Sequence, residues 1–253
     1  MPEIVYTLSR VSYEYGPGAP ALHGVDLTIA EGESVALLGA NASGKTTLLR
    51  LLAGLASPTA GAITAFGAPL TPESLRDRVF AAAFRRRVGF VFQNADAQLF
   101  SPTVAAEIAF GPLQLGLDEA AVAARVRDTM ALLGIEHLAE RAPFHLSGGE
   151  KRKVAIGSVL SLGPDVLLFD EPTTGLDPRS RGWLVRFLRA LREAGKTIVT
   201  ATHDLDIVGR LADRAVVLGE DHRVWSDAPI GAVLADHGLL VGTNLAEPRG
   251  SEP

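Results

Sequence analysis

Cysteine is absent from the sequence. The chain therefore offers no disulfide, no thiolate nucleophile and no cysteine-based zinc site, a composition that fits the reducing cytosol. Long apolar runs are also absent: no stretch of about 18 apolar residues occurs, so we expect no segment that crosses a bilayer. Met1-Pro2-Glu3 lacks the basic start and apolar core of a signal peptide, and none is predicted. If the protein acts at a membrane, partner subunits must supply the spans.

An excess of positive charge is missing as well. The formal net charge is −5 and the pI is about 5.7. A general nucleic-acid binder usually presents a basic face or stripe, so this balance argues against nucleic acid as the partner. With 47% hydrophobic and 21% charged residues, the 253-residue chain has an ordinary globular composition and enough length for one large or two small cores.

Short apolar runs and helical patterns alternate along the chain. Buried strands are predicted at Ser34–Leu38, Val166–Phe169 and Thr197–Ala201, further strands at Ile4–Tyr15 and Leu22–Ile29, and a closing hairpin from Val216–Leu218 and Arg223–Trp225. Helices are predicted over residues 46–55, 69–87, 118–133, 147–162 and 182–193. Because a mostly helical block separates two strand-containing regions, the pattern predicts an α/β sheet with a helical insertion.

A glycine-rich loop follows the first buried strand. Residues 39–46 read GANASGKT, which fits G-x-x-x-x-G-K-[ST]. In such a loop, successive backbone N–H groups and the positive end of the next helix cradle phosphates. Lys45 is predicted to reach the β and γ phosphates, and the Thr46 hydroxyl to join Mg²⁺. The predicted nucleotide-binding residues here are Gly39, Asn41, Ala42, Ser43, Gly44, Lys45, Thr46 and Thr47.

Two carboxylates end the strand Val166–Phe169. Asp170 and Glu171 lie where ligands bind in open α/β sheets. Asp170 can hold Mg²⁺, directly or through water, and Glu171 can orient or deprotonate an attacking water. His203 follows the strand Thr197–Ala201, so it can touch the γ phosphate. Together with the loop, these residues predict a nucleoside triphosphate site with magnesium.

The order of motifs carries a family resemblance. Leu146-Ser147-Gly148-Gly149-Glu150 precedes a helix, and the sequence runs from the phosphate loop through Gln93 and this LSGGE to VLLFDE, GLD and TH. This series resembles the ATP-binding-cassette (ABC) ATPases over nearly all of residues 4–225. The resemblance implies a P-loop NTPase fold, with a RecA-like core, an antiparallel β edge and an inserted α-helical subdomain.

The resemblance also implies domain limits. One nucleotide-binding domain spans 1–250, with its core at about 1–90 and 150–225, a helical subdomain at about 91–149, and a helical or frayed tail over 226–253.

What the resemblance implies for single residues involves a second subunit. Two such domains, with a second copy of this chain favoured over a different one, sandwich two ATP molecules head to tail. Glu171 is the implied catalytic base, His203 the switch, and Gln93 the sensor of magnesium or water. Tyr15, preferred to Tyr13, stacks on adenine. The facing subunit supplies the remaining implied residues, namely Ser147, Gly148, Gly149 and Asp177.

The segment after Gln93 narrows the resemblance. QNADAQLF resembles a short helix in energy-coupling-factor (ECF) transporter ATPases, and FSPTVAAEIAFGPLQLGL resembles their cobalt and nickel branch. This implies that Asp96, Gln98 and Leu99 contact a transmembrane coupling subunit, which works with a substrate-binding membrane subunit. It places the chain at the cytoplasmic face of the membrane, as an ATPase powering metal uptake. Ala42 and Ala95 depart from the family's usual glycine and proline, and Glu150 from its commoner glutamine.

Three alternatives remain at this stage. The ATPase could serve another ABC importer, for a vitamin or other small molecule. It could be a soluble ABC ATPase acting on nucleic acid, but such proteins usually need long coiled-coil arms, a tandem second cassette or a basic face. It could also be a regulatory nucleotide-binding module without turnover, which is expected to lack Glu171 or His203, and both are present.

Overall fold

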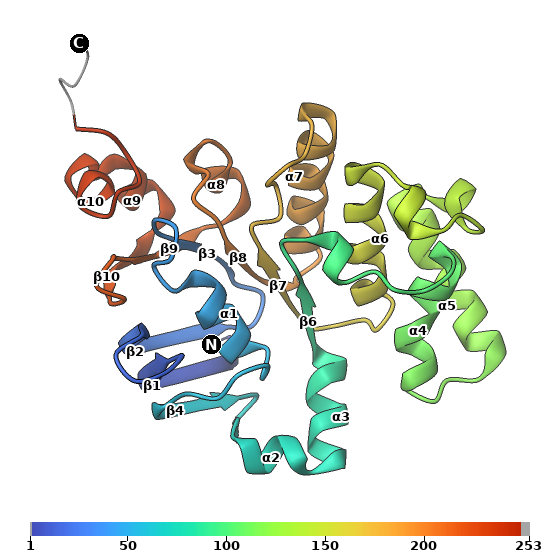
Figure 1. Ribbon diagram of the computed structural model, residues 1–253, viewed down its shortest axis with the longest axis horizontal. Coiled ribbons are helices and arrows are strands. Elements are labelled where there is room, and N and C mark those ends of the chain that lie inside the picture. Colours follow the sequence, from blue (N-terminus) through green and yellow to red (C-terminus); the bar gives the residue numbers. More distant parts are fainter. Residues whose placement is uncertain (1, 249–253) are drawn as a thin grey trace.

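The computed structural model describes residues 2–248, and its elements form two sheets with helices around them (Figure 1). The larger, six-stranded sheet has the order β10-β9-β3-β8-β7-β6. Its strands β9, β3, β8, β7 and β6 are parallel, and β10 pairs antiparallel with β9. These strands are β3 (Ser34–Leu38), β6 (Val88–Val91), β7 (Val166–Asp170), β8 (Thr197–Ala201), β9 (Arg214–Leu218) and β10 (Val224–Pro229).

The second sheet is antiparallel and has the order β2-β1-β4-β5. It consists of β1 (Ile4–Glu14), β2 (Pro20–Ala30), β4 (Ala60–Ala65) and β5 (Ala68–Pro69). Helix α1 (Lys45–Leu52) joins one hydrophobic core with residues of both sheets, and its Leu48 and Leu52 are 0% exposed. The buried Tyr6 of β1 donates a hydrogen bond of 2.9 Å to the Leu52 carbonyl, which ties the antiparallel sheet to the end of α1.

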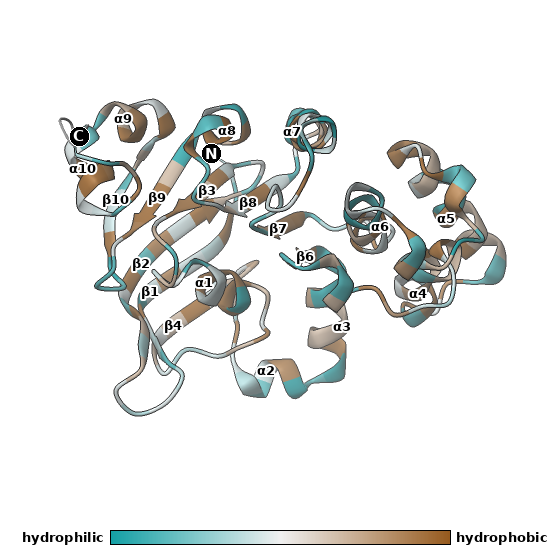
Figure 2. Cartoon of the chain, turned by 45° about the horizontal axis from the view of Figure 1, so that its top comes forward, coloured by the Kyte–Doolittle hydropathy of each residue, from teal (hydrophilic) through white to brown (hydrophobic). Residues whose placement is uncertain are grey.

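The remaining helices cover the larger sheet and extend its β6 end (Figure 1). They are α2 (Pro72–Arg76), α3 (Arg78–Arg87), α4 (Val104–Gln114), α5 (Glu119–Leu133), α6 (Gly148–Leu160), α7 (Pro178–Glu193), α8 (Leu205–Leu211), α9 (Ile230–Ala235) and α10 (His237–Gly242). A second core joins α4, α5 and α6 to β7 and α7, and a third packs α9 and α10 against β3 and β9. Figure 2 shows that the strands of the larger sheet are mostly apolar, as expected for a sheet buried on both faces.

The predicted strands are confirmed, with small shifts at their ends, but one helix prediction is wrong. The predicted helix 69–87 is two helices, because Asp77 adopts an extended backbone (φ −66°, ψ 119°) between them. Its side chain accepts a hydrogen bond from the Phe80 N–H and so begins α3, while Thr71 begins α2 with a capping box. β4, β5 and α8 were not located from the sequence, whereas α9 and α10 lie within the tail 226–253 that was predicted to be helical or frayed. Residues 249–253 of that predicted tail lie outside the described residues.

A close approach between β6 and α6 fixes the helical end of the sheet. Gly89 is buried in β6, and a Cβ there would lie 2.2 Å from Val159 Cγ1 of α6 and 3.2 Å from Pro164 Cγ. Valine is stiff about χ1, so Val159 cannot easily turn away.

Gly89→Ala is therefore expected to lower the free energy of unfolding by about 1–3 kcal/mol through overpacking. Thermal unfolding of the purified protein measures the effect. Gly231→Ala in α9 is the matched control, because nothing lies within 4 Å of the added methyl group. Equal melting temperatures for the two variants would contradict the close packing of β6 on α6.

Candidate functional site

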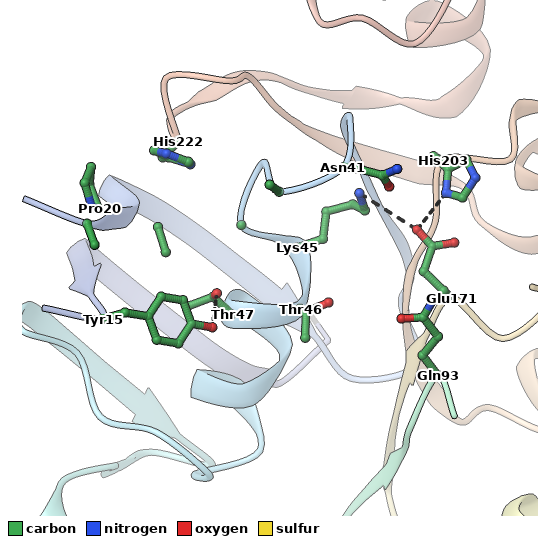
Figure 3. Close-up of a pocket in the computed structure, with 14 residues that line it drawn as sticks. Tyr15, Pro20, Asn41, Lys45, Thr46, Thr47, Gln93, Glu171, His203 and His222 are labelled. Carbon is green, nitrogen blue, oxygen red and sulfur yellow. Dashed lines mark hydrogen bonds and ion pairs between the residues drawn. The ribbon is translucent and has the colours of Figure 1, made fainter. Parts of the chain in front are cut away.

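The glycine-rich loop connects β3 to α1 and lines a pocket of about 480 Å³ (Figure 3). Gly39 (φ 152°) and Gly44 (φ 108°) adopt left-handed backbone, and a Cβ at either position would collide with a backbone carbonyl, that of Leu218 at 2.6 Å or that of Ala21 at 2.2 Å. Glycine is thus required at both positions. Ala42 also has positive φ (64°), so its methyl group is accommodated with local strain.

Lys45 crosses the loop from the first residue of α1. Its Nζ donates hydrogen bonds to the carbonyls of Gly39 (2.8 Å) and Ala40 (2.9 Å), and it lies 3.8 Å from Glu171 Oε1. Burial lowers the pKa of Lys45, while the charges of Glu171 and Asp170 oppose that shift. The Lys45 ammonium therefore donates to two neutral carbonyls beside the loop N–H groups. Charged phosphate oxygens are stronger acceptors and can replace these carbonyls.

Asp170 ends β7 directly beneath α1. The Thr46 hydroxyl donates a 2.9 Å hydrogen bond to Asp170 Oδ1. Burial raises the pKa of Asp170, and the bond from Thr46 partly opposes the shift. Hydroxyl and carboxylate oxygens are the ligands that Mg²⁺ prefers, and it commonly takes only one or two protein groups together with phosphate and water. Within residues 2–248 no group of three or more His, Asp and Glu side chains could hold a metal, so this pair would supply only part of a magnesium shell.

Glu171 and His203 face each other across the ends of β7 and β8. His203 Nδ1 lies 2.9 Å from Glu171 Oε1, the same oxygen that Lys45 approaches (Figure 3). The second carboxylate oxygen, Oε2, is buried and has no hydrogen-bond partner among the described residues. Glu171 also has a left-handed backbone (φ 43°), a strain that commonly marks functional residues. A carboxylate with one oxygen anchored and the other unpaired is suited to accept a proton from water.

Gln93 and Tyr15 complete the two ends of this pocket. Gln93 follows β6 and lies beside Glu171 in Figure 3. Tyr15, 59% exposed, lines the opposite end, where its hydroxyl is 2.9 Å from Thr47 Oγ1. The ring of Tyr13 packs edge-on against that of Tyr15, with 5.1 Å between the centroids. The pocket therefore runs from an exposed aromatic ring to a cluster of polar side chains that includes Lys45, Glu171 and His203.

Four pocket residues were missed in the sequence, namely Ala19, Pro20, Ala21 and His222. His222 lies in the turn between β9 and β10 and lines the pocket near Pro20 (Figure 3). Its Nδ1 is 3.5 Å from the Ser43 carbonyl, and its own carbonyl accepts a hydrogen bond from the His23 N–H. No motif signals this residue, because only the pairing of β9 with β3 brings the turn to the phosphate loop.

The LSGGE segment and Asp177 do not line this pocket. Ser147 caps α6, and its N–H and hydroxyl donate to Glu150 Oε2 at 2.9 and 2.8 Å, which lowers the pKa of Glu150. Asp177 caps α7 by accepting hydrogen bonds from the backbone N–H groups of Arg179 and Ser180. Gly148 and Gly149 open α6, away from the chain's own phosphate loop.

The three predicted coupling residues point in different directions. Asp96 is exposed and forms an ion pair of 2.6 Å with Lys151 of α6. Gln98 turns inward: its amide accepts from the Phe92 N–H (3.1 Å) and donates to the Ala155 carbonyl (2.7 Å). Leu99 packs against the helical core. Gln98 and Leu99 therefore hold the segment in place more than they present it to a partner.

An apolar groove adjoins this segment, and of its lining residues only Gln98 was predicted from the sequence. Phe100 is 68% exposed and Phe110 of α4 is 43% exposed, and their rings meet edge-on at 4.9 Å. Both line a groove of about 410 Å³ together with Arg85 of α3 and Leu162 after α6. Glu107, 2% exposed, accepts hydrogen bonds from the N–H groups of Phe100 and Ser101 and so fixes the groove's edge.

Comparisons with known sequences agree with the site's geometry. The sequence profile of the family described as ABC transporter matches residues 22–174. The nickel import ATP-binding protein NikO of Rhodobacter capsulatus is 51% identical over 93% of this chain and 93% of that protein. The energy-coupling factor transporter ATP-binding protein EcfA of Methanoculleus marisnigri is 44% identical over 94% of this chain and 84% of that protein.

Solved structures give the same result for the fold. CbiO1 from Clostridium perfringens, part of the ABC transporter complex CbiONQ, has a TM-score of 0.82 at 35% identity, over 98% of this chain and 97% of that one. A dimeric ATP-binding cassette in a post-hydrolysis state, bound to ADP and Pi, has a TM-score of 0.79 at 28% identity, over 89% of this chain and 98% of that one. The predicted fold class, a P-loop core with an antiparallel β edge, is confirmed. In residues 2–248 no helix combines the length and apolar character needed to cross a bilayer.

The burial of Asp170 gives a testable dependence on pH. Because its pKa is raised in the folded protein, its contribution to stability is full below the unfolded-state pKa and is lost as the pH rises through the folded-state pKa. Asp170→Asn cannot ionise but can still accept the hydrogen bond from Thr46. Its melting temperature should exceed that of the wild type at about pH 8, and the difference should shrink toward about pH 4. Differential scanning calorimetry at both values measures this, with the exposed Asp128→Asn as control; a gain that is equal at both values would contradict it.

Proposed function

This chain belongs to the ABC transporter family as one of its ATP-hydrolysing subunits, and we propose that it powers an ECF-type importer of nickel or cobalt ions. ATP hydrolysis is supported by one observation: Lys45, Glu171 and His203 meet in one pocket beside the phosphate loop. The cargo is supported by similarity over nearly the whole chain to an ATPase named for nickel import, and the chain is also similar to CbiO1, a part of the transporter complex CbiONQ.

The pocket accommodates ATP in one orientation. Tyr15 offers an exposed ring for the adenine, and the loop N–H groups and the start of α1 receive the phosphates. Lys45 then transfers its donors from the Gly39 and Ala40 carbonyls to the terminal phosphates. The γ phosphate consequently lies near Gln93, Glu171 and His203.

Hydrolysis requires a positioned water at that end of the pocket. Glu171 is the proposed base, because its unpaired, buried Oε2 can accept the proton while Oε1 stays anchored to His203. His203 holds the carboxylate and is placed to sense the γ phosphate. Gln93, from the neighbouring strand end, orients the same water or the metal's hydration shell.

Magnesium fits the oxygen-rich end of this site. Thr46, Asp170 and Gln93 are the residues proposed to hold it, directly or through water. When bound, Mg²⁺ would neutralise negative charge that develops on the phosphate groups during hydrolysis. Burial raises the pKa of Asp170, and the hydrogen bond from Thr46 opposes that rise and so favours the charged carboxylate that a metal ion needs.

A second copy of the chain is needed to close the site. Ser147, Gly148 and Gly149 form a bare, capped helix start that has no role in the chain's own pocket. A helix start attracts anions, so the facing copy would present it to the γ phosphate. Asp177, at the start of α7, would lie at the same interface. The dimeric state of a structurally similar cassette supports this arrangement.

The groove beside residues 96–100 is the proposed docking site of the transmembrane coupling subunit. The aromatic pair Phe100 and Phe110 suits the apolar face of a short helix, and the exposed Asp96, paired with Lys151, lies in the neighbouring segment. Gln98 lines this groove and accepts a hydrogen bond from the Phe92 N–H, one residue before Gln93. One short segment therefore connects the docking surface to the nucleotide pocket. The subunit would work at the cytoplasmic face of the membrane, where a separate substrate-binding membrane subunit captures the metal ion.

Glu171→Gln tests the proposed base. The amide cannot accept the proton, so steady-state ATP hydrolysis should fall about 100-fold or more. ATP binding should persist, and the ATP-bound dimer should accumulate on size-exclusion chromatography. Glu73→Gln, an exposed change in α2, should hydrolyse ATP like the wild type. Unchanged turnover in Glu171→Gln would remove this residue from the mechanism.

Phe100→Ser tests the docking surface. Removing the exposed ring should weaken co-purification with the membrane subunits at least tenfold, as expected for an aromatic hot spot. Cells should lose uptake of labelled nickel or cobalt, while ATP hydrolysis by the isolated protein persists. Leu132→Ser, equally exposed on α5 at 62%, is the control. If Phe100→Ser assembles normally with the membrane subunits, this groove is not their docking site. If the wild-type complex imports neither nickel nor cobalt, the proposed cargo is wrong.

A further inference from the structure

Three side chains fasten the segment 92–98 to helix α6. Lys151 pairs with Asp96, and Gln98 reaches the Ala155 carbonyl and Ser158 Oγ. Arg152 makes the third attachment: its Nη1 and Nη2 donate to the carbonyls of Phe92 (2.6 Å) and Gln93 (2.5 Å). The segment that carries Gln93 is thus attached to α6 as well as to the end of β6.

Arg152 is unusual among these three because it is buried. Its side chain is only 4% exposed, and its Nε–H has no hydrogen-bond partner among residues 2–248. Burial lowers its pKa, and only the charge of Asp170 opposes this. A buried guanidinium without a directly paired carboxylate opposes folding, and a well-packed apolar side chain would commonly be at least as stable. Stability alone therefore does not account for an arginine at this position.

The geometry of its two bonds suggests what the arginine does. The Phe92 carbonyl belongs to the peptide plane before the Gln93 Cα, and the Gln93 carbonyl belongs to the plane after it. Peptide planes are rigid, so holding both fixes the φ and ψ of Gln93. The direction in which the Gln93 side chain leaves the backbone is then determined, and that side chain lines the nucleotide pocket.

The same helix begins at the segment that faces the second copy. Ser147 caps α6, and Arg152 lies five residues further on, about 7.5 Å along the helix axis. A shift of α6 would consequently move both Ser147 and the two peptide planes of Gln93. One rigid helix thereby connects the chain's own pocket with the nucleotide site completed by the facing copy.

We propose that Arg152 is a positioning residue: it sets the backbone of Gln93 for hydrolysis in the chain's own pocket and links that setting to the position of α6. The inference rests on the role proposed above for Gln93. It predicts that Arg152 affects turnover through Gln93 and leaves nucleotide affinity intact, because Arg152 touches neither the phosphate loop nor Tyr15.

A double-mutant cycle in the full-length dimeric protein tests this. Arg152→Met should lower kcat about tenfold or more, since a misplacement of about 1 Å can cost that much, while the dissociation constant for ATP changes less than about twofold. In a Gln93→Ala background, the same change should lower kcat less than about twofold further. Arg152→Lys keeps the charge but cannot hold both carbonyls in a fixed fork. Its kcat should lie between those of the wild type and Arg152→Met, and this change too should have little further effect in the Gln93→Ala background.

Arg125→Met is the matched control. Arg125 also donates to a carbonyl of the α6 segment, that of Ser161 at 3.0 Å, but lies at the opposite end from Gln93. The effect of Arg125→Met on kcat should be the same with and without Gln93→Ala.

The outcomes separate the inference from its premise. If Gln93→Ala hydrolyses ATP at the wild-type rate, the role of Gln93 is wrong and the inference falls with it. If Gln93→Ala is impaired but the effects of Arg152 and Gln93 multiply independently, Arg152 only braces the fold and the inference alone is overturned. Should Arg152→Met fail to fold, the cycle with Arg152→Lys decides between the same two results.

Discussion

The whole candidate site depends on one constraint: β3, β8, β7 and β6 are neighbours that run parallel, so their carboxyl ends meet at one edge of the sheet. Each end carries one part of the site, in the order phosphate loop, His203, Asp170 with Glu171, and Gln93. Ligands bind at such edges because side chains and helix starts converge there. Because these strands are buried on both faces, the edge is rigid enough to place the groups within hydrogen-bonding distance.

Several charges are buried around that edge at some expense to stability. Burial lowers the pKa values of Lys45 and Arg152 and raises that of Asp170, so in each case it favours the neutral form. Neighbouring opposite charges, and for Asp170 also the hydrogen bond from Thr46, oppose these shifts only in part. The strained backbone of Glu171 adds to this. A site whose charges are held in place before the ligand arrives needs little reorganisation when phosphate and metal bind, which is the arrangement that favours catalysis. The apolar cores around α1 and α6 supply the stability that this arrangement requires.

Sequence reasoning was most accurate where one local rule decides the structure. The apolar runs predicted the central strands, and the predicted helices over 118–133 and 147–162 match α5 and α6 to within two residues at each end. It was wrong over 69–87, where Asp77 interrupts a helical pattern through a local side-chain bond. It missed β4, whose short AGAITA sequence is weakly apolar and becomes a strand by pairing with β1. Such pairing depends on a partner distant in sequence, and no local signal records it.

By itself, the sequence determined the chemistry: a phosphate loop, a carboxylate pair, a histidine and a glutamine in an order typical of one ATPase family. These residue types are dictated locally, since a phosphate cradle needs glycine and a base needs a carboxylate. Only the tertiary structure decided where each side chain points and which side chains meet. It brought His222 to the phosphate loop, turned Gln98 and Leu99 inward, exposed Phe100, and placed Arg152 under Gln93. Those contacts join segments far apart in the chain. The pairing of β9 with β3 sets the position of His222, and the attachment of the segment after β6 to α6 sets those of Gln98 and Arg152.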